Sequence, residues 1–178
     1  MGSLYLGPWR IDVEWRDGVA RLVPGARLAR AVAAALDAAG APSPASIGLI
    51  LSDDTELAEL NAAHMGKTGP TDVLSFPLLP PAAFPPHPGR AEDGIPAAVF
   101  VLPPGTRQHL GDIIVSVERA VEQAAHGRGG HTGDVRWDAR DELRLLVTHG
   151  ALHVCGWDHA EPEEEAAMRA VERELLAR

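Results

Sequence analysis

Alternating and periodic hydrophobic positions divide this chain into short strands and amphipathic helices. Residues 11–15 alternate apolar with acidic side chains, which is typical of a half-buried strand. Three further apolar runs have the length and composition of strands, at 46–52, 73–78 and 110–117. The pattern therefore predicts a sheet of about four strands.

Helical patterns lie between and after these strands. Pro24 opens an alanine-rich amphipathic segment that runs to about Ala39. The capping residues and acids of 52–56 begin a second helix. Further helices are expected at 118–126, 138–154 and 162–176, and the charges of the last one are expected to face solvent. With 178 residues, we predict one compact domain spanning 1–178.

Proline crowds one stretch between the third and fourth predicted strands. Eight prolines fall within the segment at about 79–105, so it forms neither a continuous helix nor a central strand. We expect a loop insertion there, with an edge strand at Ala97–Leu102. A second loop is expected at Gly127–Gly133, where glycine is abundant.

Three histidines near the C-terminus provide the strongest chemical signal. His149 and His153 are four residues apart, so a helix presents both imidazoles on one face. Gly156 can end that helix in a left-handed conformation, and the chain can then return to deliver His159. Three neutral imidazoles leave the fourth position of a tetrahedral Zn²⁺ for water, as in catalytic zinc sites. We expect one zinc ion per chain, although the same ligands also suit nickel, cobalt and copper.

Several residues near the histidines are candidates for supporting roles. Glu142 lies two turns before His149 on the same helix face, so it either supports the site or is a solvated acid near the helix start. Asp158, next to His159, can orient a ligand or accept a proton. Cys155 is the only cysteine; we expect a buried thiol on the side away from the histidines. A single cysteine excludes an internal disulfide and suits a reducing cytoplasm.

Charge and hydropathy narrow the class of partner. The formal net charge of −9 argues against a protein that coats nucleic acid indiscriminately, because such binding depends mainly on neutralising phosphates. A local basic cleft is still compatible with this charge. No apolar run approaches the roughly 18 residues that span a bilayer, and the first 15 residues lack the apolar segment of a secretory signal. We therefore expect a cytoplasmic protein with no membrane partner.

Four sequence islands resemble the YbeY-type bacterial endoribonuclease family, the rRNA maturation factors. They are, in order, Leu60-Asn61, Pro70-Thr71-Asp72-Val73-Leu74-Ser75-Phe76-Pro77, Leu110–Ser116 and His149–His159. The resemblance implies an α+β fold in which helices cover a mixed sheet, with zinc on the three histidines. It also implies single-strand-specific RNA cleavage in maturation of the 16S 3′ end and in ribosome quality control. Ribosomal RNA, ribosomal particles or ribosomal proteins are then the expected partners.

The chain departs from the family pattern in two places. The family usually has an arginine shortly after its Leu-Asn pair, and Met65 holds that position here, with Lys67 close enough to substitute for it. The proline-rich segment is also longer than in typical members. We expect Lys67 and Ser75 to contact RNA. Asp72 and Asp112 match the family islands, but aspartates at strand ends more often cap turns.

Two other functions stay open from the sequence. Zinc proteases of the metzincin type have a glutamate general base directly after the first histidine, where this chain has Gly150, so peptide hydrolysis ranks below RNA hydrolysis. A non-catalytic ribosome assembly factor with a structural metal is the other possibility, motivated by Met65. In the enzyme hypothesis, zinc lowers the pKa of its bound water and polarises a phosphoryl oxygen, which supplies much of what a base would.

Overall fold

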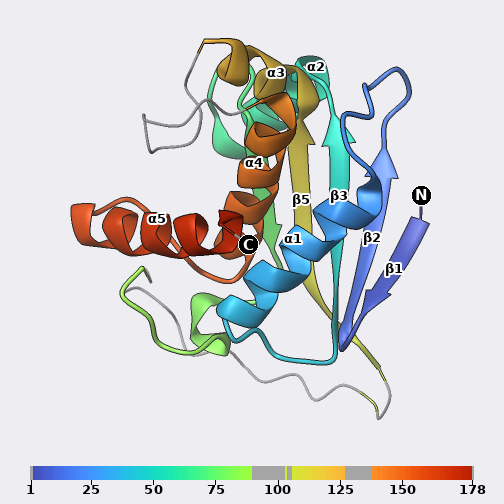
Figure 1. Cartoon of the computed structure of the whole chain (residues 1–178). Helices are drawn as coiled ribbons and strands as arrows, with labels where there is room; N and C mark the ends of the chain where they lie inside the picture. Colours follow the sequence, from blue (N-terminus) through green and yellow to red (C-terminus); the bar gives the residue numbers. More distant parts are fainter. Residues whose placement is uncertain (1, 90–102, 104–105, 127–137, 178) are drawn as a thin grey trace.

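A computed structural model of the chain describes residues 2–89, 103, 106–126 and 138–177 (Figure 1). Within them, one mixed sheet has the strand order β1-β2-β3-β5-β4, in which the three inner strands are parallel and both edge strands are antiparallel to their neighbours. The predicted α+β fold is confirmed, with five strands rather than about four. The strands are β1 (Gly2–Leu6), β2 (Trp9–Trp15), β3 (Ala45–Ser52), β4 (Val73–Pro77) and β5 (Gln108–Ser116).

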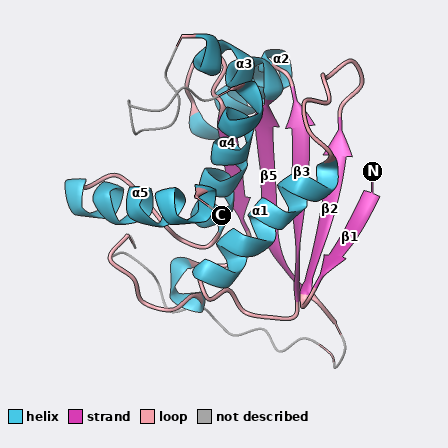
Figure 2. Cartoon of the chain, viewed as in Figure 1, coloured by secondary structure: helices cyan, strands magenta, loops and turns pink. Residues whose placement is uncertain are grey.

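All five predicted helices are present, and their ends agree with the prediction to within about two residues. Figure 2 shows α1 and α4 across one face of the sheet, with α5 extending away from α4. None of the described helices is both long and apolar enough to cross a membrane. The helices are α1 (Gly25–Ala38), α2 (Asp54–Leu60), α3 (Val117–Ala125), α4 (Ala139–Val154) and α5 (Pro162–Leu176), with a short π-helix η1 (Asn61–Met65) after α2 and a 3-10 turn η2 (Pro81–Ala83).

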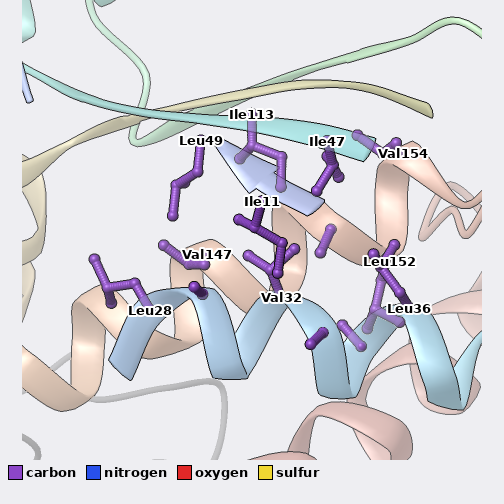
Figure 3. Close-up of a cluster of buried hydrophobic side chains, with 14 of the residues drawn as sticks. Ile11, Leu28, Val32, Leu36, Ile47, Leu49, Ile113, Val147, Leu152 and Val154 are labelled. Carbon is purple, nitrogen blue, oxygen red and sulfur yellow. The ribbon is translucent and has the colours of Figure 1, made fainter. Parts of the chain in front are cut away.

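The main hydrophobic core lies between the sheet and the two helices α1 and α4 (Figure 3). Strand residues that alternate along the chain point toward the helices, and helix residues about four apart point back toward the sheet. Complete burial of α4 side chains on this side fixes the rotation of that helix about its axis. The labelled residues are all fully buried: Ile11, Leu28, Val32, Leu36, Ile47, Leu49, Ile113, Val147, Leu152 and Val154.

The strand that the pattern did not predict is β1. It lies at the edge of the sheet beside β2, and none of its residues is fully buried: the half-buried Leu4 and Leu6 flank Tyr5, which is 64% exposed. In the sequence these are three consecutive apolar residues, so no alternation of apolar and polar side chains marks the strand. In the proline-rich segment, the structure describes the turn η2 and the residues up to Gly89. The edge strand predicted at Ala97–Leu102 and the loop predicted at Gly127–Gly133 lie outside the described residues.

Candidate metal centre

The end of α4 and the turn after it bring the three histidines together. Asp138 caps the start of α4, because its side chain accepts hydrogen bonds from two backbone N–H groups of the first turn. His149 and His153 lie one turn apart near the other end of the helix. Gly156 then takes a left-handed conformation, with φ of 81°, and the chain turns back to place His159 beside them. The predicted arrangement of helix, glycine and third histidine is confirmed.

The distances between the imidazoles fit a single metal ion. The Nε2 atoms of His149 and His153 face each other at 3.0 Å. One ligand nitrogen from each of the three histidines lies within 4.8 Å of the other two. Nitrogens bound to a tetrahedral Zn²⁺ at its usual bond length are roughly 3.3 Å apart. The three residues could therefore hold one ion after small side-chain movements.

A buried carboxylate orients the first of these histidines. Oε1 of Glu172, on α5, lies 2.7 Å from Nδ1 of His149, and Glu172 is only 3% exposed. A carboxylate at this position accepts a hydrogen bond from Nδ1–H of His149, and this leaves Nε2 turned toward His153 with its lone pair. The expectation that the charges of α5 face solvent is wrong for Glu172. It shares the buried face of α5 with Met168 and Leu175, and an acid on that apolar face is the sequence signal that could have identified it.

The environment of His153 keeps its imidazole neutral. Burial lowers the pKa of His153 to about 4, and electrostatic repulsion from His149 and His159 acts in the same direction. A backbone hydrogen bond with Trp157 and the charge of Asp158 oppose this decrease of the pKa. A neutral imidazole offers a lone pair to a cation, so His153 is in the state that metal binding requires at physiological pH.

Two other acids were predicted to support the site. Glu142 is 3% exposed and lines the same cleft as the histidines, so its interpretation as a solvated acid is wrong. Its role behind the metal ligands stays a prediction. Asp158 also lines the cleft, and its Oδ1 accepts a hydrogen bond of 2.7 Å from the backbone N–H of His159. This bond fixes the turn that carries His159, while orientation of the ring or proton transfer by Asp158 stays a prediction.

The histidines lie in a cleft of about 1570 Å³. One side is formed by η1, the loop after it and β4, where Met65 and Lys67 are exposed and Ser75 is half-buried. Another side is formed by α5. Small-molecule pockets usually occupy roughly 300–1,000 Å³, so this cleft has room for a segment of a polymer. Both Lys67 and Ser75, the predicted RNA contacts, line it, and the Ser75 hydroxyl donates a 3.0 Å hydrogen bond to the carbonyl of Gly150.

Gly150 occupies a position where α4 touches the sheet. A Cβ atom there would lie 2.6 Å from Cγ2 of Ile113 and 3.0 Å from Cγ2 of Val73. Real side chains do not approach so closely, so this position has no room for a glutamate. The general base of a metzincin protease therefore has no equivalent at this place in the fold.

Three other residues singled out from the sequence, Cys155, Asp72 and Asp112, lie within or next to helices and strands of the fold. Cys155 caps the C-terminal end of α4 as a free, buried residue, and burial raises the pKa of its thiol to about 12. Asp72 caps the start of β4, since its Oδ1 accepts a hydrogen bond of 2.9 Å from the backbone N–H of Val73. Asp112 lies inside β5, so its interpretation as a strand-end cap is wrong; its Oδ1 lies 3.2 Å from Nε2 of His109.

Comparison with known proteins extends over nearly the whole chain. The family model described as "Endoribonuclease YbeY" matches residues 22–178, a range that includes the cleft and all three histidines. A curated protein of that name from Roseiflexus sp. (strain RS-1) is 37% identical over 167 residues, which are 93% of this chain and 90% of the relative. The protein of that name from Thermobifida fusca is 38% identical over 169 residues, which are 94% of this chain and 92% of the relative.

A solved structure shares the fold. The solution structure of a Thermotoga maritima protein matches with a TM-score of 0.50 at 21% sequence identity, over 94% of this chain and 89% of that one.

Proposed function

Because this chain belongs to the YbeY endoribonuclease family, we propose that it is a zinc-dependent endoribonuclease specific for single-stranded RNA. Membership of that family makes it a nuclease and a hydrolase with RNA as its substrate. The observation that carries the proposed zinc dependence is the facing pair of Nε2 atoms of His149 and His153, 3.0 Å apart, beside His159. When bound, the ion supplies Lewis acidity, which activates water and polarises a phosphoryl oxygen.

The residues around this pair prepare it for a cation and a substrate. Glu172 holds His149 with Nε2 unprotonated, and burial keeps His153 neutral. We assign Asp158 the role of orienting His159 or accepting a proton, because it already fixes the adjacent turn. Glu142 places a second buried carboxylate in the cleft, from which it can support the ligands.

Substrate contacts come from the side of the cleft that β4 and the loop after η1 form. Lys67 is exposed there and offers an ammonium group to a phosphate. Ser75 retains acceptor capacity in its hydroxyl although it donates to Gly150, so it can accept from an RNA hydroxyl or base.

In the cell, we assign this activity to maturation of the 16S 3′ end and to ribosome quality control. Ribosomal RNA is then the substrate, and ribosomal particles or ribosomal proteins are the partners that deliver it. The cytoplasm is the compartment in which these partners occur. A free, buried cysteine with no disulfide partner in the chain suits that reducing compartment.

Cleavage and metal content, measured on the same samples, test the proposal. We expect the purified protein to cleave single-stranded ribosomal RNA, to spare a duplex of the same sequence, and to contain one zinc ion per chain. His149→Ala should lose cleavage and zinc together. His126→Ala is the matched control, since His126 is exposed at the end of α3 and does not line the cleft. Zinc without cleavage in the unmutated protein would contradict the enzyme.

A non-catalytic assembly factor with a structural metal is the second candidate. The exposed Met65 favours it, because an uncharged side chain stands in the cleft where a cation would assist phosphate binding. Co-sedimentation with ribosomal particles distinguishes the two functions. Binding that survives His149→Ala, combined with absence of cleavage by the unmutated protein, would support the assembly factor.

A further inference from the structure

The described lining of the cleft contains more acidic side chains than lysines and arginines. Among the described residues that line it, Lys67 and Arg169 are the only lysine and arginine, and they come from different elements. A phosphate backbone that enters the cleft meets few positive groups, so each of these two cations has a large share in binding it. The acidic residues of the lining are Asp72, Glu142, Asp158, Glu165 and Glu172.

Arg169 is held at a defined distance from the metal centre. It precedes Glu172 by three residues on α5, so the two side chains lie on neighbouring positions of one helix face, with a rise of roughly 4.5 Å between them. Glu172 contacts His149, and Met168, beside Arg169, is 1% exposed. The helix that carries Arg169 is thus anchored to the site on both sides of it.

The guanidinium of Arg169 is only partly used within the protein. One Nη atom forms an ion pair with Glu165, one turn earlier on α5. The Nε atom is buried and has no hydrogen-bond partner in the described part of the chain. A phosphate that displaced Glu165 would accept from an Nη atom, and also from Nε once the guanidinium turned toward the cleft, which gives the bidentate geometry that arginine prefers.

We propose that Arg169 binds a backbone phosphate of the RNA strand, and that Glu165 holds the guanidinium in the cleft and competes with that phosphate. The inference rests on the proposed RNA cleavage at the same cleft. On the side of the cleft formed by η1 and the loop after it, Met65 is 57% exposed and uncharged, and Lys67 is the only lysine or arginine among the described lining residues there. The second such residue, Arg169, comes from α5. Arg169 is thus a substrate-binding residue that the sequence islands do not contain.

Binding and kinetics with three variants test this role. Binding of a labelled single-stranded RNA is measured by fluorescence anisotropy with chelator present, and cleavage is measured with zinc. Arg169→Ala should weaken binding and raise KM about tenfold with little change in kcat, since a charge-assisted contact is lost. It should also reduce the salt slope of binding by about 0.7. Arg173→Ala, an exposed position on the same helix that does not line the cleft, is the control.

Glu165→Gln provides a test of opposite sign. It retains Arg169 and removes the competing carboxylate, so RNA binding should tighten by about threefold. This variant decides the question if Arg169→Ala fails to fold, as judged by circular dichroism and zinc content. Unchanged binding in Glu165→Gln, or an Arg169→Ala that behaves like Arg173→Ala, overturns the inference while cleavage by the unmutated protein stands. Loss of the proposed function would instead appear as absence of cleavage in the unmutated protein.

Discussion

A single buried hydrogen bond determines which nitrogen of His149 is available to a cation. Glu172 accepts from Nδ1, so the lone pair of Nε2 faces His153. Neutral Nε2 atoms at 3.0 Å from one another repel unless a proton or a metal ion lies between them. The carboxylate of Glu172 orients His149, and burial keeps His153 neutral. Both effects favour binding of a metal ion between the two imidazoles.

Removing the charge of Glu172 should weaken metal binding. In Glu172→Gln the shape is retained, but the amide can donate as well as accept, so the tautomer of His149 is no longer fixed. We expect zinc affinity to fall about 10- to 100-fold, measured by competition with a chromophoric chelator. Glu163→Gln, on the exposed first turn of α5, is the control. Equal affinities in the two variants would show that Glu172 does not orient His149.

The thiol of Cys155 should be unreactive in the folded protein. It should also cause the free energy of unfolding to decrease as the pH rises into the alkaline range. Burial raises its pKa from 9.0 to about 12, so the unfolded chain releases this proton at lower pH than the folded protein does. The contribution of the thiol to stability is therefore complete below pH 9 and decreases as pH rises toward 12. We expect slow labelling by a thiol reagent at pH 9 unless denaturant is added. In Cys155→Ala the thiol part of the pH dependence should disappear; an equal decline in both proteins would contradict this.

At the scale of elements, the contact between α4 and the sheet positions the histidines. Gly150 lies against Ile113 of β5 and Val73 of β4, and it directly follows His149. A bulkier residue would separate the helix from the sheet by a few tenths of an ångström or more. Because both helical ligands lie within one turn of this contact, the distance between α4 and the sheet also sets the distance from the ligands to the rest of the cleft.

Gly150→Ala should therefore destabilise the protein. In an unconstrained helix interior the same change stabilises by up to about 1 kcal/mol, so the sign of the effect distinguishes the two situations. Here the added methyl group meets Ile113 at 2.6 Å, and we expect a loss of about 1–3 kcal/mol in the free energy of unfolding. Urea denaturation of the metal-free protein measures it. A gain in stability would mean that α4 has more room beside the sheet than the structure indicates.

The helices and strands that could be predicted from the sequence are those in which the spacing of apolar residues matches the face that is buried. The apolar positions of β2 and the helical spacing in α1 and α4 place one face of each element in the core, so the pattern alone located them, although Asp12 on the other face of β2 is also buried. In β1 the half-buried Leu4 and Leu6 are separated by Tyr5, which is exposed but apolar, so the sequence shows an apolar run and no alternation. The strand forms because β2 supplies its hydrogen-bond partners, and the hydrophobic periodicity of a segment carries no information about such pairing.

From residue spacing, the site could be predicted only in the part that one helix and one turn create, while Lys67 and Ser75, which also line the cleft, were predicted through the family resemblance. His149, His153 and His159 are close in sequence, and their spacing determines a common location. Glu172 and Arg169 reach the cleft because α5 packs against α4, and the angle at which one helix packs on the next is a tertiary contact that residue spacing does not give. Because Glu172 is charged, it was expected to face solvent. It is buried because it shares a face of α5 with Met168 and Leu175, and that face packs against the rest of the protein.

At the scale of the whole molecule, the charge of the protein opposes its proposed substrate. A net charge of −9 repels a polyanion overall, and Lys67 and Arg169 are the only lysine and arginine in the described lining of the cleft. Attraction is therefore local, and it is increased when a divalent cation occupies the three histidines. This distribution favours RNA that is presented to the cleft, by a ribosomal particle for example, over RNA captured by general electrostatic attraction.

The dependence of RNA affinity on salt measures how local that attraction is. If two cations contact phosphates, log K for a single strand should fall with log salt concentration with a slope of about −1.4 in chelator, because each contact contributes about −0.7. Anisotropy titrations between 50 and 200 mM salt, roughly the range in which such slopes are compared, give this value directly. A protein that binds RNA over a broad basic surface shows slopes several times steeper. A slope of about −4 or steeper would mean that cations outside the cleft bind the strand, and RNA would then be recognised over a surface rather than at the metal centre.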